Sequence, residues 1–76
     1  MPTNWEYTLH IPHDPRAVAV ARHTLAHILT THHLTPLLDP AQLLTSELLG
    51  NAIRHTNGPA AMKVGQRGGA GLRLEA

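Results

Sequence analysis

The chain of 76 residues contains no cysteine and no phenylalanine, and only 14% of its residues are charged. The absence of cysteine excludes a disulfide framework, a thiolate zinc site and a cysteine nucleophile, and a reducing cytoplasmic location is the expectation. No apolar run reaches the roughly 20 residues of a membrane span, and the N-terminus lacks the charged-then-apolar layout of a signal peptide. Neither membrane insertion nor export is predicted.

Aromatic residues and excess positive charge are also scarce. Trp5 and Tyr7 are the only aromatic residues, which argues against a stacking platform for single-stranded nucleic acid, and they are predicted to cover the sheet or a dimer contact. Six Lys and Arg against five Asp and Glu give a net charge of +1. Such a balance cannot neutralise a phosphate backbone, so no nucleic-acid partner is predicted.

Hydrophobic periodicity predicts a strand, two helices and a hairpin. Alternation of apolar and polar residues is typical of a strand, whereas apolar residues at steps of three and four indicate a helix. Each helix is expected to begin at an Asp-Pro pair, where the Asp caps the first turn. The predicted elements are, in order, a strand Trp5–Ile11, helices Asp14–His32 and Asp39–His55, and strands Ala60–Gln66 and Leu72–Glu75, with a glycine-rich turn at residues 67–71.

These elements predict an α+β two-layer sandwich in which both helices lie on one face of a small sheet. Leu72, Leu74 and Ala76 still alternate at the last residue, and a chain this short buries only roughly 60% of its unfolded surface. Residues 1–76 are therefore expected to form a single, incomplete domain. Its open sheet edge predicts self-association, for instance as a homodimer.

Polar residues that could transfer a proton or bind a metal ion or phosphate follow one side of the second predicted helix. Glu47, Asn51 and His55 stand four residues apart, which places them in one stripe. A Glu carboxylate can take a proton, an Asn carbonyl oxygen can ligate a hard cation, and a His or Arg can meet phosphate oxygens. On spacing alone, a solvated polar face is the simpler explanation of the stripe.

The residues around the stripe favour a functional site over a solvated polar face. The segment Ser46-Glu47-Leu48-Leu49-Gly50-Asn51-Ala52-Ile53-Arg54-His55-Thr56 resembles the N-box, Glu-x-x-x-Asn-Ala-x-x-His, of bacterial anti-sigma-factor serine/threonine kinases. These belong to the ATPase superfamily of gyrase, heat-shock chaperones and histidine kinases. Residues 5–16 are similar to the opening strand and helix start of the actinomycete members, and the chain from Pro59 onward is similar to the hairpin that follows the N-box. The resemblance covers nearly the whole chain and implies part of a Bergerat-type ATPase fold.

The resemblance also implies roles for individual residues. Glu47 would be the general base that activates the attacking hydroxyl, and Asn51 would ligate the magnesium ion of Mg-ATP. His55 and Arg54 would lie near the phosphates. The implied partners are an anti-anti-sigma protein, which such kinases phosphorylate, and a sigma factor, which they sequester in transcription regulation.

One departure from the family limits these roles. After the strand that corresponds to Leu72–Glu75, family members carry an Asp-x-Gly-x-Gly box, whose Asp recognises the adenine base. A lid and a second glycine box follow it. This chain has only Asp14 and Asp39, both expected at helix starts. We therefore expect the chain by itself to bind Mg-ATP weakly or not at all and to lack kinase activity. The alternative is a non-catalytic protein-interaction module.

Overall fold

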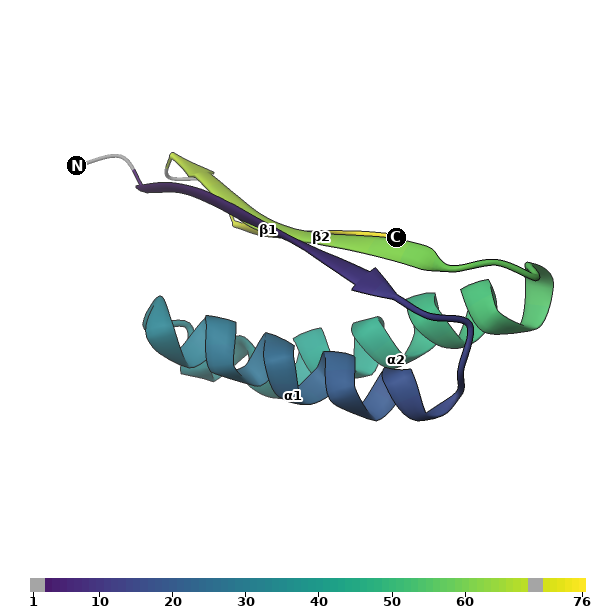
Figure 1. Cartoon of the computed structure of the whole chain (residues 1–76). Coiled ribbons are helices and arrows are strands. Elements are labelled where there is room, and N and C mark those ends of the chain that lie inside the picture. The colour runs from purple at the N-terminus through teal and green to yellow at the C-terminus, as the bar shows by residue number, and fades with distance from the viewer. Residues whose placement is uncertain (1–2, 69–70) are drawn as a thin grey trace.

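The computed structural model describes residues 3–68 and 71–76, and these form a three-stranded antiparallel sheet above a pair of helices (Figure 1). The elements are β1 (Thr3–Ile11), α1 (Arg16–Thr31), a short 3-10 turn η1 (Thr35–Leu37), α2 (Leu38–His55), β2 (Ala60–Gly68) and β3 (Leu72–Glu75). This order and the α+β class confirm the sequence prediction. No helix in the described residues combines the length and apolar character needed to cross a membrane.

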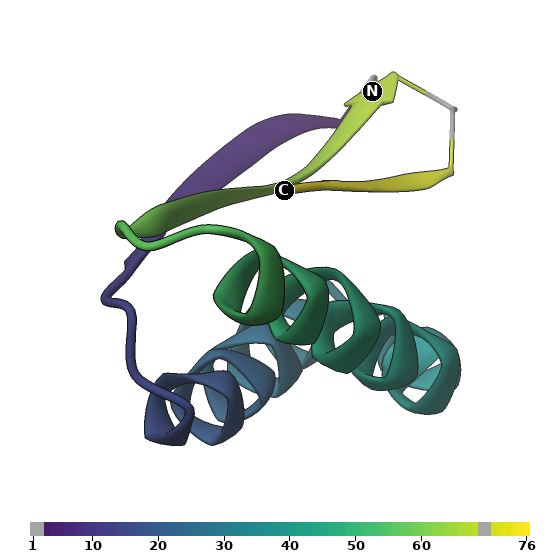
Figure 2. The ribbon, with the colours of Figure 1, turned by 90° about the vertical axis from the view of Figure 1, so that its right-hand side faces the viewer.

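The sheet has the order β1-β2-β3, so its longer ladder, β1 with β2, joins residues distant in sequence. Tyr7 pairs with Val64, and Val64 pairs with Leu74 across the next ladder. Because side chains alternate along a strand, this register places the three side chains on one face of the sheet. That face lies toward the helices (Figure 2).

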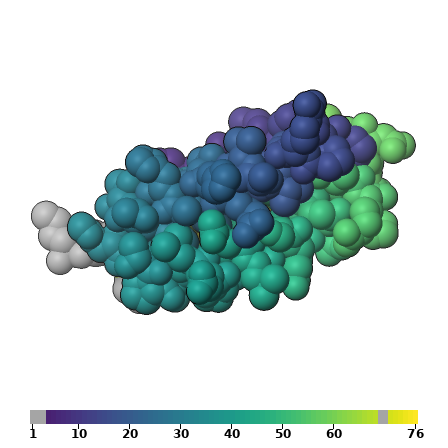
Figure 3. Space-filling model, turned by 90° about the horizontal axis from the view of Figure 1, so that it is seen from below, coloured from purple at the N-terminus to yellow at the C-terminus, as the bar shows by residue number. Residues whose placement is uncertain are grey.

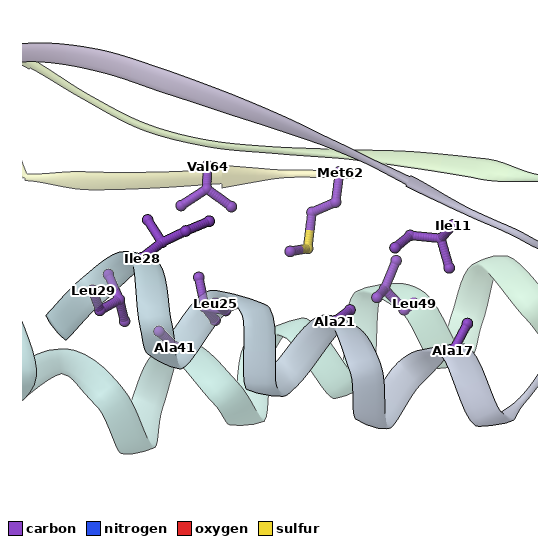
Figure 4. Close-up of a cluster of buried hydrophobic side chains, with 10 residues drawn as sticks. All are labelled: Ile11, Ala17, Ala21, Leu25, Ile28, Leu29, Ala41, Leu49, Met62 and Val64. Carbon is purple, nitrogen blue, oxygen red and sulfur yellow. The ribbon is translucent and has the colours of Figure 1, made fainter. Parts of the chain in front are cut away.

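The core fills the space between this face and the helices (Figure 4). Its members are apolar and nearly inaccessible: Ile11, Ala17, Ala21, Leu25, Ile28, Leu29, Ala41, Leu49, Met62 and Val64. Leu25, Leu49 and Met62 are fully buried. Truncating such a side chain to Ala typically costs about 2–5 kcal/mol, so these contacts dominate the stability of so small a domain. Seen from below, α1 and α2 lie side by side and cover this core (Figure 3).

The start of α1 differs from the prediction by two residues. The helix begins at Arg16 rather than Asp14, although Asp14 keeps a capping role because its Oδ1 accepts the Arg16 backbone N–H at 2.9 Å. The Arg16 guanidinium also binds this carboxylate, with Nη2 2.7 Å from Oδ2. The bond from the Arg16 side chain and, to a smaller extent, the bond from its backbone N–H hold the pKa of the Asp14 carboxyl below its usual value.

The capping role predicted for Asp39 is wrong. α2 begins at Leu38, directly after η1, so Asp39 lies inside the first turn, and among the described residues no side chain caps this helix. The 3-10 turn extends the helical path upstream of the Asp-Pro pair. Pro40 fits there because the first turn of a helix needs no N–H from it. Asp39 instead places a negative charge near the positive end of the helix dipole.

His32 and His33 directly follow the last residue of α1. The helix stops at Thr31, and the Leu34 and His33 N–H groups donate to the carbonyls of Leu29 (2.7 Å) and Thr30 (3.2 Å). This is a Schellman motif, in which the residue at the second position after the helix adopts a left-handed conformation. His33 has that conformation, with φ of 59°.

The aromatic residues lie on the helix face of the sheet near the same helix end. The Trp5 ring stacks on the His32 imidazole, with centroids 3.9 Å apart, and the Tyr7 hydroxyl lies 2.9 Å from His32 Nε2. Trp5 Nε1 also donates to the side-chain oxygen of Gln66 on β2. Of the two predictions for the aromatics, covering the sheet is therefore confirmed.

The strand ends extend slightly beyond the prediction. β1 begins at Thr3 and β2 continues to Gly68, while β3 has the predicted bounds. Part of the predicted glycine-rich turn, residues 69–70, lies outside the described residues. Within β2, Gly65 is required by a close approach, because a Cβ there would lie 2.9 Å from the Trp5 carbonyl oxygen.

A glycine at the left-handed position should stabilise the fold. His33→Gly removes the steric cost that a side chain imposes at positive φ and should raise the free energy of unfolding by about 0.5–1 kcal/mol. Urea denaturation followed by circular dichroism measures this. The matched control, His27→Gly on the exposed side of α1, should lower it by about 1 kcal/mol. A loss of stability in His33→Gly would contradict the assignment.

A buried hydroxyl offers a second test. Thr45 is fully buried in α2, and its Oγ1 has no hydrogen-bond partner among the described residues. Thr45→Val keeps the shape and removes the unsatisfied group, so unfolding should cost about 1 kcal/mol more. In the control Thr30→Val an exposed hydroxyl bonded to the Ala26 carbonyl is removed, and no gain is expected. Destabilisation by Thr45→Val would show that the hydroxyl is satisfied.

Candidate functional site

The predicted stripe lies on the solvent-facing side of α2. Glu47, Asn51, Arg54 and His55 all fall within this continuous helix, and all four are exposed. The orientation follows from the buried residues Ala41, Thr45 and Leu49 of the same helix, which repeat every four residues on the opposite side. The predicted placement of Glu47, Asn51 and His55 along one helix side is therefore confirmed.

The end of α2 is held by contacts beyond the helix itself. Thr56 becomes extended, and its N–H and hydroxyl both bond the Ala52 carbonyl, at 3.0 and 2.6 Å. His13, from the loop before α1, places Nε2 2.9 Å from the Ile53 carbonyl oxygen. These contacts fix the last turn, which carries Arg54 and His55.

Asn51 and Arg54 are linked directly. Arg54 Nη2 donates to Asn51 Oδ1 at 2.5 Å, the oxygen that would ligate a magnesium ion. The positive charge of the guanidinium disfavours a cation at this oxygen, so a metal ion would bind there more readily if the guanidinium moved away. Because the arginine is exposed on a flexible stem, such an exchange requires no change in the backbone.

The charges around the stripe have mixed effects. The C-terminal half of a helix carries partial negative charge, which favours a bound metal cation and disfavours phosphate. Arg54, and His55 when protonated, lie in the last turn and offset this for an anion. Glu47 is the one carboxylate of α2 beyond its first turn. A metal held here would therefore depend mainly on ligand oxygens from the nucleotide, as is usual for magnesium.

An apolar groove adjoins the stripe, and sequence analysis did not find it. The groove has a volume of about 340 Å³ and lies between the first turns of α2, with Ala41 and Leu44, and the residues Leu72 and Leu74 of β3. Leu44 stands two helical turns before Asn51, so the groove and the stripe share one side of α2. Leu44 continues the apolar periodicity of α2, but the residue is 42% exposed.

A second hollow lies on the outer face of the sheet, on the side away from the helices. It has a volume of about 320 Å³, a floor at Gly65 and a rim that includes Lys63, Arg67, Arg73 and Glu75. The alternation Lys63, Gly65, Arg67 along β2 is the signal that could have located it, since residues two apart share a face. Its charges are of both signs, and no other observation points to a ligand.

Carboxylate and imidazole groups do not gather elsewhere. Within residues 3–68 and 71–76, no three His, Asp or Glu side chains come close enough to hold a metal ion together. Comparisons of the chain with protein-family models, with curated proteins and with solved structures give no match. The kinase resemblance of residues 46–56 therefore stays a prediction.

Removal of the arginine should make the stripe a better cation site. In Arg54→Ala the Asn51 oxygen is free and one positive charge is gone, so Mn²⁺ affinity should rise about fivefold. Paramagnetic broadening of the backbone amide signals of residues 47–55 measures this. The control Arg22→Ala removes a positive charge from the exposed side of α1 and should leave the Mn²⁺ affinity of the stripe as it is in the wild type. Equal affinities in all three proteins would contradict competition between Arg54 and the metal.

Proposed function

We propose that this chain is an ATP-binding regulatory domain of the anti-sigma-factor serine/threonine kinase type, with part of a Bergerat-type fold. The observation that carries the proposal is the exposed stripe of Glu47, Asn51 and His55 on one side of α2. The strand-helix-helix-strand-strand order with both helices on one face also agrees with it.

The chemistry assigned to each residue fits its surroundings. Mg²⁺ requires hard oxygen ligands, and the Asn51 side chain presents one at the surface once Arg54 turns away. The guanidinium released from Asn51 can then meet a phosphate oxygen. Bound Mg-ATP would supply the transferable phosphoryl group. Glu47, exposed one turn before Asn51, would accept the proton of the attacking hydroxyl.

Recognition of the adenine is the weak part of the site. Asp14 and Asp39, the only Asp residues of the chain, lie at the N-terminal ends of the two helices, and Asp14 is engaged with Arg16. Contacts to metal and phosphate alone offset little of the ordering cost of binding a nucleotide. The chain by itself should therefore hold Mg-ATP weakly.

The apolar groove favours a second candidate function, a non-catalytic protein-interaction module. Leu44 is 42% exposed beside Leu72 and Leu74, and contiguous exposed apolar surface is typical of protein-contact sites. By resemblance, the partners of such a module would be a sigma factor or an anti-anti-sigma protein. Binding of such a partner that survives Glu47→Ala and Asn51→Ala would support this candidate over nucleotide chemistry.

A magnesium-dependent nucleotide titration tests the first proposal. Two-dimensional NMR of the chain with Mg-ATP should show shifts confined to α2 residues 47–55, with a dissociation constant of about 1 mM. Asn51→Ala should remove the magnesium dependence of these shifts. The control Asn57→Ala deletes the same group from an exposed position beyond the helix.

Two results would contradict the proposal in different ways. Unchanged α2 signals at saturating Mg-ATP would remove the site altogether. A micromolar dissociation constant would show that the chain reads the adenine without an Asp-x-Gly-x-Gly box, and would overturn the expectation of weak binding.

A further inference from the structure

β3 forms one edge of the sheet in the described part of the chain. It pairs with β2 on one side only, which leaves the backbone N–H and C=O groups of its other side without a strand. Such an edge is a template for another strand. On the helix face Leu72 and Leu74 are only half-buried, next to the apolar groove.

The charges of β3 suit one partner, a second copy of the same strand in the antiparallel direction. Arg73 and Glu75 alternate with the two leucines, so both charged side chains lie on the outer face of the sheet. Within one chain they already form an ion pair, with Arg73 Nη2 2.6 Å from Glu75 Oε1, and both remain more than half exposed. Each charge is thus available to a neighbouring strand.

The register of this pairing follows from the same charges. Pairing that sets leucine side chains against charged ones is excluded, because it would place charge on the core side. Setting Arg73 opposite its own copy, or Glu75 opposite its own copy, opposes like charges directly. With Leu72 facing Leu72 of the second copy, Arg73 would face Gly71 and no ion pair would form. The register with Leu74 facing Leu74 of the second copy sets Arg73 opposite Glu75 of the second copy on both sides of the two-fold axis, and opposite charges favour it.

We infer that the chain forms a symmetric dimer through β3 in this register, giving a continuous six-stranded sheet. The two-fold axis is perpendicular to the sheet, so the helices of both copies lie on the same face. The two apolar grooves then meet across the axis. Leu44 of each copy, exposed in the single chain, is covered by the joined grooves, and this burial adds to the strand pairing.

The other sheet edge does not offer the same complementarity. β1 carries Glu6 as its only permanently charged residue, so no register of β1 against itself pairs opposite charges. On the helix face of β1, the Trp5 and Tyr7 side chains already pack on His32 of the same chain, so they are less available to a second copy. The strand pairing itself uses none of Glu47, Asn51, Arg54 and His55, so charge reversal on β3 tests the dimer without altering the proposed nucleotide-binding residues.

Charge reversal tests both the dimer and its register. Arg73→Glu alone and Glu75→Arg alone each set like charges opposite one another twice, and each should raise the dimer dissociation constant about tenfold or more. Mixing the two variants should restore dimerisation, because every opposing pair in the mixed dimer is again attractive. The internal Arg73 and Glu75 ion pair is broken in both variants, so recovery on mixing cannot come from a repaired single chain.

The measurement is sedimentation equilibrium of the wild type, of each variant and of the equimolar mixture up to about 1 mM protein. Arg67→Glu, on the outer face of the central strand, is the matched control and should dimerise like the wild type. Circular dichroism confirms that each variant is folded. A monomeric wild type would overturn the dimer, and a mixture that associates no better than its components would overturn the register.

Discussion

The packing of one side of α2 against α1 and the sheet is the contact on which the rest of the structure depends. Ala41, Thr45 and Leu49 recur every four residues and are buried, so the opposite side of the helix must face solvent. Since the helix cannot rotate without exposing Leu49 or burying Glu47, this packing fixes where every polar group of α2 lies. The candidate site is thus a consequence of the core rather than an addition to it.

The same packing leaves part of the sheet uncovered. α1 lies under β1 and α2 under the following strands (Figure 2). Beside β3 the helix layer leaves an apolar groove. Two helices of 16 and 18 residues are enough to bury Met62 and Val64 on the central strand. They cover Leu72 and Leu74 on the edge only in part. The exposed apolar surface and the free strand edge therefore occur together, which is why one partner could satisfy both.

Chemistry and packing compete for the residues around Asn51. The amide oxygen that suits a magnesium ion is held by Arg54, and the helix end that favours a cation also carries the groups suited to phosphate. The arrangement is therefore a surface that metal and anion could occupy together, as they do in a magnesium nucleotide. Neither ion alone meets a complete set of ligands there.

Local sequence patterns predicted the element types and their order well, because each element carries its own periodicity. The turn chemistry was less predictable. Asp14 does accept the N–H of the helix it precedes, whereas the identical Asp-Pro pair at Asp39 lies inside a helix already begun by η1. The His33 terminus was missed, since a left-handed non-glycine residue has no distinctive sequence signal.

The sequence by itself therefore determined the strand-helix-helix-strand-strand order and the stripe of Glu47, Asn51 and His55, because these depend on spacing along one segment. Only the tertiary structure decided that Leu44 is exposed, that Arg54 binds Asn51, that His32 stacks on Trp5 and that β3 is an edge strand in the described part of the chain. These features depend on which segments meet and on how far the helix layer extends. Periodicity within a segment carries no information about either.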